Sequence, residues 1–115
     1  MSITPARIES RLLELSKEID ESHESLVTAE NEYNLAKASL EINMAKSRMK
    51  NSHPDLKMTA VMREDQAIID NEANHLRLAQ AEAIVKATRA NVQRIRTQVD
   101  IARSIAVSVR TSMEM

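Results

Sequence analysis

The chain has 115 residues and a formal net charge of −1, and it contains no glycine, cysteine, tryptophan or phenylalanine. Without glycine it lacks both the tight turns that β-hairpins need and any glycine-rich phosphate loop, which excludes sheet folds and nucleotide sites of that type. Without cysteine it has no disulfide and no thiolate for zinc or catalysis. Its alanine, leucine, glutamate, lysine and arginine are typical of helices. We therefore predict a single all-α domain over residues 1–115.

The first predicted element is one long helix over about residues 5–50. Thr4 can cap its first amides, and Pro5 suits the first helical position. Apolar residues then recur in steps of four and three, as in a coiled coil. This first stripe consists of Ile8, Leu12, Leu15, Ile19, Ser22, Leu26, Ala29, Tyr33, Ala36 and Leu40. A helix of this length needs partners along it.

A single turn over residues 51–55, which contains His53-Pro54, is predicted to end this helix. A second helical region then runs over about residues 59–112, with Thr59 as its cap. No proline or glycine interrupts it. Its early part carries a thin apolar stripe every seven residues, formed by Met62, Ile69, Leu76 and Ala83.

The C-terminal part of the second helix, residues 83–113, has a richer apolar repeat. Val85, Val92, Val99, Ala106 and Met113 recur every seven residues, Thr88, Ile95, Ala102 and Val109 complement them, and Ile101 and Ile105 widen the stripe. Two helices of a small chain cannot bury all of this surface, so we expect a helical homo-oligomer. The predicted oligomer interface consists of Val85, Val92, Ile95, Val99, Ile105 and Val109.

Charge alternates along the chain in four bands. Residues 1–43 are net −5, residues 44–63 net +4, residues 64–82 net −4 and residues 83–115 net +4. Such bands indicate either complementary packing between helices or a local site for anions.

No set of residues converges into an active site or a metal site. The three histidines are far apart, and the pair Glu72 and His75 lacks the second Glu-x-x-His that a di-iron bundle needs. We therefore expect no enzyme activity, no catalytic residue, no metal and no cofactor. No apolar run is long enough to span a membrane, and residues 1–11 do not resemble a signal peptide, so a cytoplasmic location is expected.

The basic band is the candidate binding site. Lys46, Arg48 and Lys50 alternate at the end of the first helix, and Lys57 follows the turn. Cations are favoured at a helix C-terminus, which accounts for part of this cluster without any function. The same cations, repeated in every subunit of an oligomer, would make a positive belt suited to a nucleic-acid backbone.

In the order of these features the chain resembles the UvsY-type recombination mediators of tailed phages. The resemblance rests on Ala45-Lys46-Ser47-Arg48 at the end of the first helix, on Leu56-Lys57-Met58-Thr59-Ala60-Val61 after the turn, and on the acids that follow, Asp65 and Asp70. Met58 separates a lysine and a threonine that are adjacent in that family, and the aromatic residues of known mediators are missing here.

The resemblance implies a non-catalytic protein that binds single-stranded DNA and contacts a single-strand-binding protein and a RecA-like recombinase. It also implies that Lys46 and Arg48 match the DNA-binding pair, whereas Lys50 and Lys57 are added from the charge pattern alone. If the chain is phage-encoded, the host cytoplasm is its expected location. The alternative is a coiled-coil adaptor, scaffold or chaperone that binds only proteins.

Overall fold

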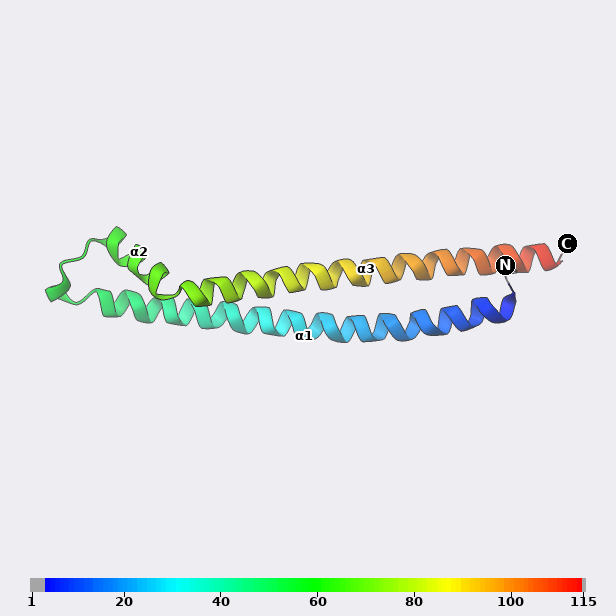
Figure 1. The fold of residues 1–115 in the computed structure, drawn as a ribbon, viewed down its shortest axis with the longest axis horizontal. Coiled ribbons are helices and arrows are strands. Elements are labelled where there is room, and N and C mark those ends of the chain that lie inside the picture. The colour runs from blue at the N-terminus through cyan, green and yellow to red at the C-terminus, as the bar shows by residue number, and fades with distance from the viewer. Residues whose placement is uncertain (1–3, 115) are drawn as a thin grey trace. The chain divides into compact units, whose positions relative to one another are not determined.

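The computed structural model describes residues 4–114, which form three α-helices and one short 3₁₀ helix. In chain order these are α1 (Pro5–Asn51), η1 (Pro54–Leu56), α2 (Ala60–Asp70) and α3 (Glu72–Glu114) (Figure 1). No strand occurs among the described residues, so the predicted all-α class is confirmed. The chain divides into two compact units. The terminal unit takes the chain as far as Val27 and again from Lys86, and the central unit is Thr28–Val85.

Helix α1 begins and ends close to the predicted residues. The Thr4 side chain accepts a hydrogen bond from the Arg7 amide at 3.2 Å, as expected of a capping threonine. Every position of the first stripe is buried or half-buried, including the polar Ser22. The Ser22 hydroxyl donates to the Ile19 carbonyl at 2.8 Å, which satisfies it without another helix. The four-and-three spacing therefore identified the inward face of α1.

The second helical region is interrupted, contrary to the prediction of one continuous helix. It starts as predicted, because the Thr59 hydroxyl accepts from the Met62 amide at 3.1 Å. α2 then ends at Asn71, whose φ and ψ of −111° and 22° are not helical. The buried Asn71 side chain donates to the Ala67 carbonyl at 2.8 Å and to the Ser47 hydroxyl at 3.0 Å. An asparagine that bonds the backbone four residues earlier competes with the helix, and the sequence pattern gave no weight to that effect.

The Asn71 junction yields a stability prediction. Asn71→Ala removes both side-chain bonds from a buried position and leaves the Ala67 carbonyl and Ser47 with fewer partners, which should cost about 1–3 kcal/mol of unfolding free energy. Asn91→Ala is the matched control, because Asn91 is exposed and accepts one bond from Arg94. Its effect should stay within about 0.5 kcal/mol in urea unfolding followed by circular dichroism. Equal losses for the two variants would contradict this role for Asn71.

The central unit has a small apolar core. Leu40 and Met44 of α1, Ala67 of α2 and the half-buried Leu78 of α3 pack together. The stripe predicted for this region is on the wrong face: Met62, Ile69 and Leu76 are 51%, 64% and 59% exposed. The break at Asn71 is the reason, because the residues that face inward are Ala67, Asn71 and Leu78, two of which are not large hydrophobic residues.

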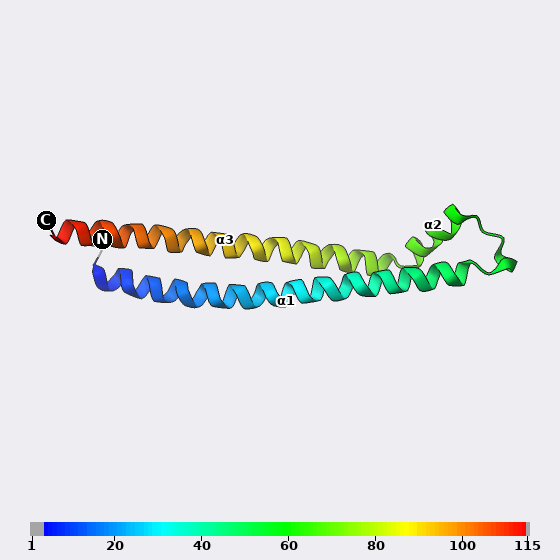
Figure 2. The same cartoon turned by 180° about the vertical axis from the view of Figure 1, so that it is seen from behind.

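The terminal unit is an antiparallel pair made by the first part of α1 and the last part of α3, which run side by side in both views (Figures 1 and 2). Leu15 is its most buried large residue, at 1% exposure, and Val92 and Ile95 are both at 4%. An Arg96 guanidinium nitrogen lies 3.4 Å from His23 Nε2, which fixes the register of the two helices. This pair therefore has an apolar interior of its own.

Candidate nucleic-acid interface

The four predicted DNA-binding residues all belong to the central unit. Lys46, Arg48 and Lys50 lie in the last two turns of α1, and Lys57 lies in the connection between η1 and α2. All four are exposed. The structure thus places every one of them on the surface, but their surroundings differ.

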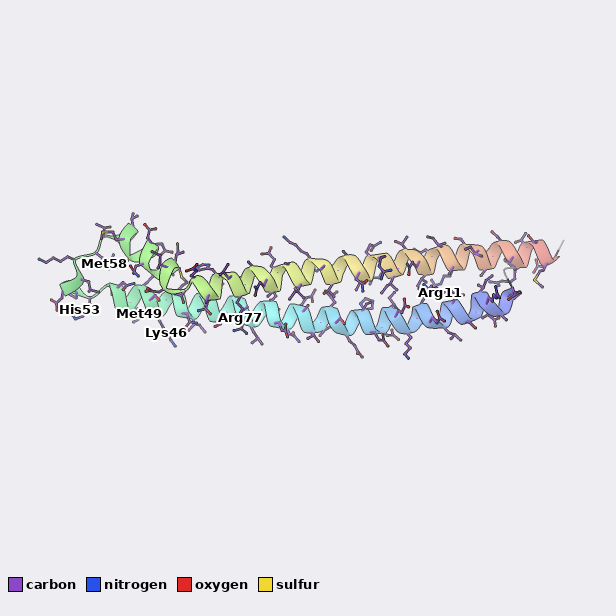
Figure 3. The ribbon with its side chains drawn as sticks, in the orientation of Figure 1. Arg11, Lys46, Met49, His53, Met58 and Arg77 are labelled. Atoms are coloured by element: carbon purple, nitrogen blue, oxygen red, sulfur yellow. The ribbon has the colours of Figure 1, made fainter. Side chains whose placement is uncertain are left out.

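Lys46 and Lys50 share one face of α1, because residues four apart are neighbours on a helix. Neither makes a hydrogen bond or an ion pair with another residue of the described chain. Lys46 lies on the side of α1 that faces away from α2 and α3 (Figure 3). Two ammonium groups without carboxylate partners are suited to contact phosphates from solvent.

Arg48 is engaged with α2. Its Nε donates to Glu64 Oε2 at 2.7 Å and its Nη2 donates to Glu64 Oε1 at 2.9 Å, a two-pronged ion pair between helices. These hydrogen bonds, and the charge of the guanidinium, hold the pKa of Glu64 below its usual range. The pair joins the second charge band to the third, as the packing explanation of the bands expects. Arg48 therefore orients α2, and its charge is largely neutralised.

The Arg48–Glu64 pair predicts a specific pH dependence. Because the folded-state pKa of Glu64 is lowered, the pair stabilises the fold above the ordinary glutamate pKa of about 4.3 and is lost as the pH falls through the lowered value. Both side chains are about half exposed, so the effect should be small. Glu64→Gln should melt below the parent at pH 7, and the difference should vanish near pH 3 in thermal melts. A difference that is constant with pH would contradict the assignment.

Lys57 lies in a connection of unusual geometry. Its φ of 49° makes it the one non-glycine residue between Thr4 and Glu114 with a positive φ. The 3₁₀ turn before it is capped by His53, whose Nδ1 accepts from the Asp55 amide at 3.3 Å. Arg63 donates to the Met58 carbonyl at 3.0 Å on the other side. Lys57 is thus held at an exposed turn between two anchored segments.

The residues predicted to lie between subunits do not form one exposed surface. Val85, Val92 and Ile95 are already buried within the single chain, because their repeat is matched by the repeat of α1. Val99 and Val109 are half-buried, and Ile105 is 38% exposed. The prediction of a shared interface is therefore wrong for the three buried residues. Assembly itself stays a prediction, and the apolar residues left exposed on this part of α3 are Ile101, Ile105, Val107 and Met113.

Two further searches of the described residues found no site. No cluster of three or more histidines and carboxylates that could hold a metal ion occurs between residues 4 and 114. Within the same range, no helix combines the length and the apolar character that crossing a membrane requires.

Sequence reasoning missed one surface feature, the apolar outer side of α2. Val61, Met62, Ile68 and Ile69 are all exposed there. The adjacent pair Ile68-Ile69 was the available signal, because two neighbouring residues of a helix cannot both face the same narrow core. In comparisons with known proteins, the chain matched no protein family, no curated protein and no solved structure.

Proposed function

We propose that this chain is a non-catalytic recombination mediator that binds single-stranded DNA and helps to load a RecA-like recombinase in place of a single-strand-binding protein. The observation that carries the proposal is the group of three exposed lysines without ion-pair partners in the described chain: Lys46, Lys50 and Lys57. They lie where the resemblance to UvsY-type mediators expects a DNA contact.

The roles of the Lys-x-Arg pair differ in this proposal. Lys46 contacts phosphate directly, whereas Arg48 holds α2 through Glu64 and positions the connection that carries Lys57. Lys50 takes the place of Arg48 at the strand, since it shares a face with Lys46. The contact is electrostatic and indifferent to base sequence. Tyr33 is the single aromatic side chain and is half-buried on α1, so base stacking contributes little.

Assembly of several copies is part of the proposal, because one copy offers only a few phosphate contacts. A homo-oligomer would place the lysines of several copies along one strand. If about five phosphates are neutralised, the association constant should fall with salt at a slope of roughly −3.5 on logarithmic axes. This corresponds to a loss of about a hundredfold between 50 and 200 mM salt.

Fluorescence anisotropy of a labelled oligothymidine titrated with the full chain at these two salt concentrations tests the proposal. The expected result is binding at 50 mM that weakens steeply with salt and is similar for an oligonucleotide of mixed sequence. No binding at 50 mM would support the second candidate, an adaptor, scaffold or chaperone that binds only proteins. The observation favouring that candidate is the set of large apolar side chains exposed on α2.

A further inference from the structure

The outer face of α2 exposes more apolar surface than its inner face buries. Val61 is 70% exposed, Met62 51%, Ile68 45% and Ile69 64%, whereas the one buried residue of the helix is Ala67. Leu76, in the first turns of α3, is 59% exposed. Single exposed hydrophobic residues are common, but large apolar residues gathered on one short helix mark an interaction surface.

Polar contacts fix the rotation of α2 about its own axis, so these residues cannot simply turn inward. Glu64 is held by Arg48, Asn71 is held by Ser47, and Ala67 packs against Leu40 and Met44. These contacts are spaced along the whole length of the helix. The apolar residues therefore stay on the solvent side while the inner face remains anchored.

Two carboxylates interrupt the apolar face. Asp65 lies one turn after Val61 and Met62, and Glu72 lies one turn after Ile68 and Ile69. Both are exposed, and neither has an ion-pair partner among the described residues. Pairing of this face with its copy in a second chain would bring like charges together. A partner with positive charge beside its apolar stripe would instead neutralise both carboxylates.

We infer that the outer face of α2 is a docking site for an amphipathic helix of another protein, one whose apolar stripe is flanked by lysine or arginine. Such a helix lays its apolar residues, spaced by three and four positions, against Val61, Ile68 and Ile69 while its cations meet Asp65 and Glu72. The site uses none of the lysines proposed to contact DNA. It therefore stands whether or not the chain binds nucleic acid.

The test uses two labelled synthetic helical peptides of about 21 residues, with leucine at heptad positions a and d and either lysine or glutamate at e and g. Anisotropy is measured with the full chain at 150 mM salt. The lysine peptide should bind at least about tenfold more tightly than the glutamate peptide. The double variant Ile68→Ser/Ile69→Ser should lose about tenfold or more in affinity for the lysine peptide, without any change in net charge.

The matched control is Ile101→Ser/Ile105→Ser, which alters the exposed apolar pair of α3 and should bind the lysine peptide as the parent does. Asp65→Asn/Glu72→Gln should reduce the preference for the lysine peptide. Circular dichroism should show that all variants keep their helical content, since the altered side chains are exposed. Undetectable binding of the lysine peptide, equal binding of both peptides, or an unaffected Ile68→Ser/Ile69→Ser variant would overturn the inference. A concentration-dependent mass that this variant abolishes would identify a second copy as the occupant and would overturn it as well.

Discussion

Replacing Lys46 and Lys50 together with alanine should weaken binding of single-stranded DNA by roughly 60-fold at 50 mM salt. This figure assumes that the variant loses two phosphate contacts, each contributing about 0.7 to the salt exponent. The slope of log K against log salt should become shallower by about 1.4 for the same reason. The loss should be the same for every oligonucleotide sequence, because phosphates and not bases are contacted.

The control for this experiment is the double variant Lys17→Ala/Lys37→Ala. It removes the same charge from exposed positions of the same helix, so a general electrostatic effect would appear in both variants. We expect the control to bind DNA within about twofold of the parent, because long-range effects are screened at this ionic strength. If the two double variants weaken binding equally, the lysines at the end of α1 are not a specific contact.

Leu15→Ala should be strongly destabilising, whereas Leu13→Ala should be nearly neutral. Leu15 is 1% exposed and Leu13 is 73% exposed, although the two residues are only two positions apart in α1. Truncating the buried leucine removes its transfer free energy and leaves a cavity, at a cost of about 2–5 kcal/mol. The melting temperature should fall by roughly 10–20 °C, while Leu13→Ala should shift it by a few degrees at most.

Thermal melts followed at 222 nm compare these two leucine variants directly. Similar melting temperatures for both would mean that α1 does not present the first stripe to α3. A destabilised Leu13→Ala variant with a parent-like Leu15→Ala variant would mean that α1 packs through the opposite face.

The sequence predicted α1 well because a single rule governs it. Thr4 and Pro5 mark its start, and a regular spacing from Ile8 to Leu40 marks its inward face. The same rule predicted the burial of Val85, Val92 and Ile95 but not their partner. The amphipathic pattern shows that a residue is covered, and it carries no information on whether the covering helix comes from the same chain.

The rule failed where polar residues decide the packing. Asn71 ends α2 and joins it to α1 through Ser47, 24 residues earlier in the chain, and no local pattern reveals such a bond. Arg48 and Glu64 are 16 residues apart, so their ion pair could not be read from helical spacing either. Because these contacts set the rotation of α2, the stripe of Met62, Ile69 and Leu76 faces outward. The candidate site was therefore located correctly by charge, but the role of Arg48 within it was not.

Lysine footprinting tests the proposed DNA contact most directly. The full chain is treated with an amine-acetylating reagent with and without a saturating oligothymidine, and the modified lysines are quantified by mass spectrometry. We predict that DNA protects Lys46, Lys50 and Lys57 from acetylation while Lys17 and Lys37, which are also exposed, react as before. Unchanged acetylation of Lys46, Lys50 and Lys57, or protection of Lys17 and Lys37 in their place, would contradict the proposed interface.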